Sequence, residues 1–346
     1  MAIQAELTPL NRDFREYLLR RHATIGRQQR FRGTTREAFE AWQPQARAVL
    51  ARVLRMPEEL GEPELVREVL DPAVQPWAGS RLDERFRVER VCYQSMPGVR
   101  VAAFLLVPTP LHAPAPAILC PPGHGRGMNQ VVFEQGIYKQ YPCELARRGF
   151  VVLVPEHLGF GERMPTLFGE HGYYTGVAQL VGFTMYGVYI KELIRALDVL
   201  TGLEEVDPSR IGCYGLSLGG VTTLLLSALD LRIRTVGISG FFTSFRATFL
   251  DVAHCVCGNV QDLALQFEHV DLASLITPRP LVLENGRADT GFPYEAAIDS
   301  ARELRDRYAL YGQEDRLVHD IFDGQHEISG RLAYDWFERW LAPATS

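Results

Sequence analysis

The chain has 346 residues, of which 47% are hydrophobic and 23% are charged, a composition typical of folded globular proteins that argues against disorder. Its formal net charge at pH 7 is −6, so it offers no excess of basic groups to attract the phosphates of nucleic acids or the headgroups of anionic lipids. We therefore expect neither nucleic acid nor a membrane among its partners.

The N-terminal sequence and the cysteines indicate the compartment. Met1 to Arg21 lacks the basic start and apolar core of a secretory signal, and no window approaches the roughly 20 apolar residues of a membrane span. The six cysteines are scattered, several in apolar strand-like runs, which favours reduced packing residues over a disulfide framework. We predict a cytoplasmic protein.

The first 80 residues are predicted to be largely helical, because apolar residues recur at helical spacing from Asn11 to about Leu70. Prolines are expected to divide this region into short helices, at Pro44 and Pro57. A domain boundary is indicated by Pro72, Pro76 and Gly79. Region 1–80 would then act either as a cap or oligomerisation element beside a functional site, or as a helical brace for a larger domain, 81–346.

After this boundary the sequence alternates between strands and helices. Short apolar runs predict strands over residues 99–107, 117–120, 150–155, 211–214, 235–239, 280–284 and 317–322. Longer stretches predict helices over residues 134–148, 177–202, 217–229, 294–308 and 328–341. Such alternation predicts an α/β fold, with a mostly parallel central sheet and helices on both faces.

One motif between a predicted strand and a predicted helix indicates a nucleophile: Gly215-Leu216-Ser217-Leu218-Gly219 matches Gly-x-Ser-x-Gly. In that setting the serine occupies a sharp turn, its hydroxyl projects above the sheet, and the glycines avoid collisions with neighbouring chain. The helix directs its positive end at the reacting carbonyl, and the backbone N–H of Leu218 can donate to an oxyanion. A chance match among 30 glycines is the alternative, and the strand–helix context argues against it.

A serine nucleophile needs a base, and in hydrolases with this motif the order along the chain is Ser, then Asp or Glu, then His. Among nine histidines, those that follow Ser217 are His254, His269, His319 and His326. His326 lies in a polar turn just beyond the last predicted strand, where an imidazole can reach over the sheet. His319 lies inside that strand, as a half-buried packing residue would. We predict His326 as the general base.

The predicted acid is Asp289, in the loop that follows the predicted strand 280–284. Its carboxylate would accept the Nδ1–H of the imidazole, fix the tautomer and stabilise the imidazolium. Asp323 is the alternative acid. It lies three residues before His326, a spacing more typical of a turn-forming residue.

A glycine-rich loop, Cys120-Pro121-Pro122-Gly123-His124-Gly125-Arg126-Gly127, follows an early predicted strand, where a second oxyanion donor usually lies. Further motifs are Gly159-Phe160-Gly161-Glu162-Arg163, Pro278-Arg279-Pro280-Leu281, Glu284-Asn285-Gly286 and Phe292-Pro293. With these motifs the chain, from about Arg87 onward, resembles the dienelactone-hydrolase and acetyl-xylan-esterase branch of the α/β-hydrolases.

The resemblance implies an α/β-hydrolase fold, a triad of Ser217, Asp289 and His326, and the backbone N–H groups of His124 and Leu218 as oxyanion donors. The sequence departs from the family pattern outside the triad, at Pro122 and Glu156.

Three further residues are candidates for substrate binding. Arg163 could orient substrate together with Glu162, or the two could form a surface ion pair. Tyr186 and Phe241 belong to an aromatic group that could line an acyl or leaving-group pocket, although core packing would explain each of them equally well.

His254-Cys255-Val256-Cys257 gathers metal-ligand residue types. Structural zinc usually has four ligands, and no second cluster of Cys and His is evident in the sequence. We therefore expect no metal here, and hydrolysis by a serine needs no cofactor. The resemblance implies that this segment is a structural loop near the site.

These observations predict a serine hydrolase that cleaves a carboxylic ester, such as an acetylated carbohydrate or another small ester, through an acyl-serine intermediate. One alternative is hydrolysis of a C–C bond by the same triad, and another is a non-catalytic binding module of the same fold. The acyl group, the alcohol and the oligomeric state stay open, a homo-oligomer included.

Overall fold

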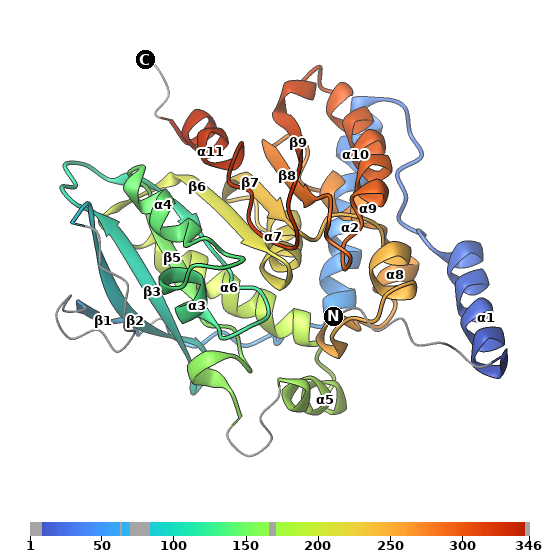
Figure 1. Cartoon of the computed structure of the whole chain (residues 1–346), viewed down its shortest axis with the longest axis horizontal. Helices are drawn as coiled ribbons and strands as arrows, with labels where there is room; N and C mark the ends of the chain where they lie inside the picture. Colours follow the sequence, from blue (N-terminus) through green and yellow to red (C-terminus); the bar gives the residue numbers. More distant parts are fainter. Residues whose placement is uncertain (1–8, 63, 70–83, 166–170, 343–346) are drawn as a thin grey trace.

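The computed structural model describes residues 9–62, 64–69, 84–165 and 171–342. Within these residues, nine strands form one sheet in the order β1-β2-β3-β5-β4-β6-β7-β8-β9 (Figure 1). The strands are β1 (Val66–Val69), β2 (Phe86–Met96), β3 (Val99–Pro108), β4 (Ala115–Leu119), β5 (Val151–Pro155), β6 (Val206–Leu216), β7 (Ile233–Ser239), β8 (Leu281–Gly286) and β9 (Leu317–Phe322).

Strands β4 to β9 are parallel, whereas β1, β2 and β3 are added antiparallel at one edge. Parallel strands that are covered on both faces need apolar residues throughout, and every residue of β5 is buried. Along β3, Val101 and Ala103 face one core cluster, and Ala102 and Phe104 face the other. The predicted sheet with covered faces is confirmed.

The helices divide between these two core clusters. One cluster takes residues from α2 (Arg36–Leu54), α6 (Met185–Thr201), α7 (Leu218–Leu229), α8 (Leu263–Gln266), α9 (His269–Ser274) and α10 (Tyr294–Ala309). The other takes residues from α3 (Met128–Phe133), α4 (Tyr141–Arg147) and α11 (Ala333–Leu341). Because β6, β8 and β9 are parallel, the loops that follow them meet at one edge of the sheet, where ligands of such folds usually bind.

The N-terminal region is only partly helical. Helix α2 continues through Pro44, so the predicted break there is wrong: the buried face of α2, which includes Phe39 and Leu50, outweighs the hydrogen bond that a proline removes. Residues 66–69 form β1, paired with β2, so the helical prediction is wrong for them as well. The predicted boundary residues Pro72, Pro76 and Gly79 lie outside the described residues.

Three predicted helices have different bounds. Segment 134–148 contains the end of a loop and α4, while α3 lies before it, and the last helix begins at Ala333 rather than Ile328. Segment 177–202 is divided into α5 (Gly172–Leu180) and α6. The division has a local cause: Gly182 has φ +95°, and the Thr184 hydroxyl caps α6 by accepting a hydrogen bond from Gly187 N at 2.9 Å.

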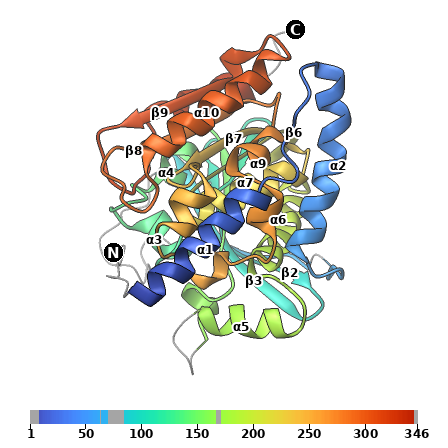
Figure 2. The ribbon, with the colours of Figure 1, turned by 90° about the vertical axis from the view of Figure 1, so that its right-hand side faces the viewer.

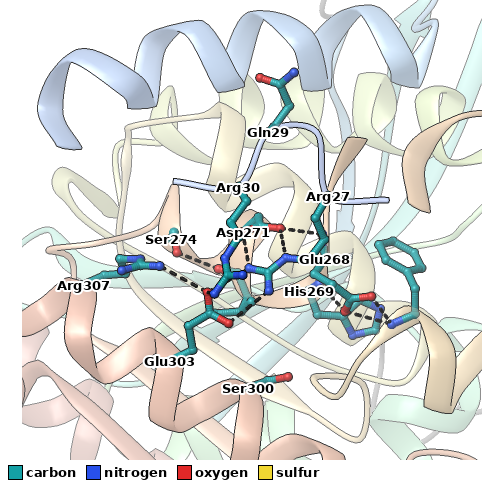
Figure 3. Close-up of polar contacts among 12 residues, drawn as sticks. Arg27, Gln29, Arg30, Glu268, His269, Asp271, Ser274, Ser300, Glu303 and Arg307 are labelled. Carbon is teal, nitrogen blue, oxygen red and sulfur yellow. Dashed lines mark hydrogen bonds and ion pairs between the residues drawn. The ribbon is translucent and has the colours of Figure 1, made fainter. Parts of the chain in front are cut away.

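The segment between α1 (Pro9–Ile25) and α2 is attached to the C-terminal half of the chain by charged contacts (Figure 3). The Arg27 guanidinium donates to both carboxylate oxygens of Asp271 on α9, at 2.9 and 2.7 Å, and to both of Glu303 on α10, at 3.1 and 2.9 Å. Helix α1 lies at the front of the view in Figure 2, and it packs against α8, which is labelled beside it in Figure 1. Among the helices that the structure describes, none is both long and apolar enough to cross a membrane.

Candidate active site

Ser217 occupies the sharp turn between β6 and α7. Its backbone has φ +63° and ψ −119°, a strained conformation for a residue with a side chain. A Cβ atom at Gly215 would lie 2.5 Å from the backbone of Gly219, and one at Gly219 would lie 2.1 Å from the carbonyl oxygen of Pro121. Both flanking positions therefore require glycine, because strand, helix and the Pro121 loop pack backbone against backbone here.

His326 and Asp289 meet at this edge of the sheet. His326 Nδ1 lies 2.7 Å from Asp289 Oδ2, and Asp289 Oδ1 accepts hydrogen bonds from the backbone N–H groups of Gly291 at 2.9 Å and Phe292 at 3.1 Å. The Asp289 side chain is 2% exposed. The Phe292 ring stacks on the imidazole with centroids 5.1 Å apart. These contacts hold the imidazole with Nδ1 toward the carboxylate, the orientation in which Nε2 can act as a base.

The alternative residues have other surroundings. The Asp323 side chain is 94% exposed and pairs with Arg287 at 3.2 Å, so the structure brings Asp289 rather than Asp323 to His326. His319 Nε2 lies 3.0 Å from Asn285 Oδ1, and burial lowers the pKa of His319 to about 4. His319 thus has the surroundings of a neutral packing residue.

A cavity of about 400 Å³ lies over Ser217, and we call it the active-site cavity. Its lining combines Ser217, Asp289 and His326 with residues from separate loops: His124, Val252, Ala253, His254, Cys255, Ala288, Thr290, Gly291, Phe292 and Gln325. In the described part of the chain, His326 is hydrogen-bonded to Asp289 and not to Ser217. In hydrolases of this kind, the contact between nucleophile and base often tightens only when substrate binds.

Two backbone N–H groups beside Ser217 have no acceptor among the described residues, those of Leu218, the first residue of α7, and of His124. The loop that carries His124 lies close to the nucleophile, since a Cβ atom at Gly123 would be 2.7 Å from the carbonyl oxygen of Leu216 and 3.3 Å from Ser217 Cβ. The Tyr138 hydroxyl donates to the His124 carbonyl at 3.0 Å and so fixes this peptide. The arrangement can present two donors to an oxyanion.

Glu156, one of the two departures from the family pattern, contacts the end of the loop that carries His124. Its Oε1 accepts a hydrogen bond from Met128 N at 3.0 Å, at the start of α3. The carboxylate fills space that Gly127 and Gly161, both at positive φ, leave open: a Cβ atom on either would lie within 2.2 Å of a Glu156 oxygen. Burial raises the pKa of Glu156 to about 7. The larger acid is thus accommodated by two glycines.

The predicted substrate-binding residues separate. Tyr186 and Phe241 line a small cavity of about 30 Å³ that also reaches Ser217. Arg163 lines neither this nor the active-site cavity, because its guanidinium binds the Glu192 carboxylate on α6 at 2.7 and 2.6 Å. Glu162 pairs instead with Arg90. The predicted pairing of Glu162 with Arg163 is wrong, since a buried guanidinium needs a buried carboxylate and Glu192 provides it.

Cys255 and Cys257 meet two histidines from distant segments. His124 Nε2 lies 3.3 Å from Cys257 Sγ, and His171 Nε2 lies 2.6 Å from Cys255 Sγ. The sequence shows no second cluster of Cys and His, but the fold brings two single histidines from separate loops to these cysteines. His254 turns away from this group, with its Nε2 3.1 Å from the carbonyl oxygen of Gly291.

Two neighbours of His326 were not predicted from the sequence. One is Phe292, three residues after Asp289, whose ring covers the imidazole. The other is Gly240, at φ +54°, where a Cβ atom would lie 3.0 Å from His326 Cε1. The signal for Gly240 was its position directly after β7, where a glycine allows a close approach of chain.

Comparisons with known proteins identify the family and the fold. A family model described as "Abhydrolase family" matches residues 25–308. The putative hydrolase YtaP of Bacillus subtilis is 31% identical over 261 residues, covering 70% of this chain and 84% of its own. The acetyl esterase Axe7A of Xylanibacter ruminicola is 30% identical over 146 residues, 39% of this chain and 31% of its own.

Among solved structures, a putative acetyl xylan esterase from Bacteroides fragilis superposes with a TM-score of 0.74, at 17% identity over 93% of this chain and 84% of its own. At that level of identity the likeness concerns the fold. Because the family model spans most of the sequence, the chain belongs to the abhydrolase family and has the α/β-hydrolase fold.

Proposed function

We propose that this protein is a serine hydrolase that cleaves carboxylic esters through an acyl-Ser217 intermediate. The observation that carries the proposal is the 2.7 Å contact between His326 Nδ1 and Asp289 Oδ2 in the cavity that Ser217 also lines. A serine on a strained turn, a base oriented by a buried carboxylate, and two N–H groups without an acceptor in the described part of the chain are the parts that acyl transfer uses.

In the proposed reaction, Ser217 Oγ attacks the ester carbonyl while His326 Nε2 takes the hydroxyl proton. The N–H groups of Leu218 and His124 bind the oxyanion, and Asp289 stabilises the imidazolium. As the C–O bond to the alcohol breaks, His326 returns the proton to the leaving oxygen. Water then loses a proton to His326, attacks the acyl-enzyme and releases the acid, which restores the Ser217 hydroxyl.

The substrate we propose is a small ester, with acetylated carbohydrates as the first class to test. Axe7A is named an acetyl esterase, and the B. fragilis structure a putative acetyl xylan esterase. The cavity of about 400 Å³ falls in the size range of small-molecule sites. Tyr186 and Phe241 would contact the acyl group in the adjoining small cavity. The cytoplasmic location stays a prediction.

The alternative of C–C bond hydrolysis would be favoured if the N-terminal helices formed a cap over the active site, but their position does not support it. In the described residues, neither α1 nor α2 contributes to the lining of the active-site cavity. Instead, Gln43 on α2 donates to the carbonyl oxygens of Ser274 at 3.0 Å and Thr277 at 2.7 Å. We infer that the helical part of region 1–80 is a brace for the catalytic domain rather than a cap.

The test combines covalent labelling with turnover. Purified wild-type protein should react with a fluorophosphonate probe and hydrolyse at least one member of a panel of aryl acetates, acetylated xylo-oligosaccharides and lactones. The Ser217→Ala variant should do neither while keeping its circular dichroism spectrum. Labelling that persists in Ser217→Ala, or a wild type that neither labels nor hydrolyses any ester, would overturn the proposal and favour the binding module.

A further inference from the structure

We propose that His124, His171, Cys255 and Cys257 bind one zinc ion in the wall of the active-site cavity. One ligand atom from each of the four side chains lies within 4.8 Å of every other. His124 and Cys255 line the active-site cavity, and Cys257 lines the small cavity beside it. The site therefore adjoins the proposed triad without containing any of its members.

The distances suit a tetrahedral ion after a small adjustment. Zinc bonds of about 2.3 Å to sulfur and about 2.0–2.1 Å to nitrogen place the two kinds of ligand atom about 3.5 Å apart in a tetrahedral site. The separation of His124 Nε2 and Cys257 Sγ is 3.3 Å. That of His171 Nε2 and Cys255 Sγ is 2.6 Å, so this pair must open by about 1 Å, which side-chain rotation of two half-buried residues permits.

The donor set selects the kind of metal. Two thiolates and two imidazoles form a nitrogen and sulfur set that favours zinc among the divalent ions of cells. The group contains no carboxylate, the ligand that magnesium and calcium prefer. Because four protein ligands complete a tetrahedron, the ion would be structural and would leave no open position for substrate.

The surroundings already orient the ligands. The Phe160 ring stacks on His171 with centroids 4.6 Å apart and meets His124 edge-on at 5.5 Å. The backbone N–H of Cys257 donates to Cys255 Sγ at 3.4 Å, and Cys255 thereby caps the start of the short helix η3 (Val256–Gly258). Because these contacts already hold the side chains of His124, His171 and Cys255 in place, fewer side-chain rotations have to be fixed when the metal binds.

The proposed ion would join three segments that the sequence keeps apart. His124 belongs to the loop after β4, His171 precedes α5, and the two cysteines belong to the segment around η3. The backbone N–H of His124 is also one of the two proposed oxyanion donors. Zinc would therefore fix both the wall of the active-site cavity and the position of that N–H group relative to Ser217.

The experiment measures metal directly and needs no substrate. Protein purified with a reductant and without chelator should contain about one zinc per chain, because the four ligands form a single site. Inductively coupled plasma mass spectrometry measures this zinc content. After removal of zinc, added Co²⁺ should give the thiolate charge-transfer and tetrahedral d–d absorption bands of a cysteine- and histidine-bound ion. Variants Cys255→Ser, Cys257→Ser and His171→Ala should each bind zinc more than about 100-fold more weakly, a larger loss than removing a hydrogen bond to a ligand causes.

Matched controls separate ligands from neighbours. His254→Ala removes the imidazole next to Cys255 in sequence, and Cys92→Ser removes a thiol on β2; both should keep the full zinc content. Ser217→Ala should also keep it, so that failure of the proposed esterase activity and failure of the metal site are distinguishable. Wild-type protein that takes up no zinc in the reduced state, or His171→Ala and Cys255→Ser variants that retain it, would overturn the proposal. Equal loss from His254→Ala would overturn the ligand assignment.

Discussion

Two aspartates, Asp289 and Asp323, are the candidate partners of His326, and their surroundings give them different roles. Asp289 is buried and fixed by two backbone N–H groups, whereas Asp323 is exposed and pairs with Arg287. A buried acceptor of the imidazole Nδ1–H sets the tautomer that leaves Nε2 free to take a proton. An exposed carboxylate in a turn has no such effect on the ring.

The first prediction follows from this difference. Asp289→Asn should lower kcat for a short aryl ester by about 10³–10⁴-fold, because the amide favours the wrong imidazole tautomer. Asp323→Asn, the matched control, should keep kcat within about twofold, as expected for an exposed turn residue. Steady-state kinetics on both variants checks the prediction. Similar losses in the two variants would contradict the assignment of Asp289.

Gly240 offers a second prediction, because its hydrogen faces His326. The Cβ atom of an alanine there would lie 2.7 Å from Leu216 Cδ1, the end of a flexible side chain, and 3.0 and 3.1 Å from Cε1 and Nδ1 of His326, at φ +54°. Gly240→Ala should therefore displace the imidazole and lower kcat at least about tenfold, the scale expected when a catalytic group is misplaced.

Gly98 is the matched control for this substitution. It has φ +75° and nothing within 4 Å of an added Cβ, so Gly98→Ala carries the same backbone cost of about 1 kcal/mol without the contact. Both variants should lose stability in thermal unfolding, and kcat should fall in Gly240→Ala alone. An unchanged kcat in Gly240→Ala would show that the imidazole tolerates the displacement.

At the scale of elements, the loop between α1 and α2 depends on Arg27. Its partner Asp271 is nearly buried, at 3% side-chain exposure, while Arg27 itself is 22% exposed. Burial alone would raise the pKa of the Glu303 carboxyl, but the hydrogen bonds and charge of Arg27 outweigh it and lower that pKa. The guanidinium is thus shared by carboxylates of α9 and α10 (Figure 3).

Arg27→Ala should lower the free energy of unfolding by about 3 kcal/mol, because it leaves the buried Asp271 carboxylate without its cation. Arg302→Ala on α10 removes an exposed pair, with side chains 72% and 76% accessible, and should cost less than about 1 kcal/mol. Urea unfolding of both variants gives the comparison. Equal effects would mean that the Arg27 contacts contribute no more than a surface pair.

The elements that could be predicted from the sequence are those whose pattern is local. Strands β3 to β9 have apolar runs that mark them independently of their neighbours, and every one was predicted. Strand β1 is exposed at all four residues, so no apolar pattern marks it, and it exists through pairing with β2. Helix α2 continues through Pro44 because its buried face packs against the rest of the protein, and the spacing of apolar residues in the sequence does not show how strongly that packing stabilises the helix.

At the scale of the whole molecule, parallel topology explains why the triad residues were predictable. The motif fixes Ser217 at the end of β6, and the ends of β8 and β9 necessarily lie at the same edge, so a search after these strands finds Asp289 and His326. The cluster of His124, His171 and the cysteines has no such rule. Its members lie in separate loops, and whether these loops come into contact depends on the conformation of each loop, which no sequence pattern specifies.

Two pairs of sequence neighbours, Glu156-His157 and Glu268-His269, each contain a buried carboxyl and a buried imidazole. Burial raises the pKa of Glu156 and of Glu268 to about 7, and it lowers the pKa of His157 and of His269 to about 3. The folded state keeps the glutamates protonated up to about pH 7, so their contribution to stability falls as pH rises from about 4.5. The histidines favour folding above their unfolded pKa near 6.5, and this contribution is lost as pH falls toward 3.

Between about pH 4.5 and 6.5 these two contributions oppose each other, and a variant can separate them. Glu156→Gln replaces the protonated carboxyl by a neutral group of the same shape that can still accept the hydrogen bond from Met128 N. At pH 4.5 the variant should match wild type, and by pH 8 it should be more stable by as much as about 3 kcal/mol, the free energy of a pKa difference of this size. Urea unfolding at a series of pH values measures the difference. If that difference were the same at pH 4.5 and pH 8, Glu156 would not be the group that holds a proton beneath the oxyanion loop.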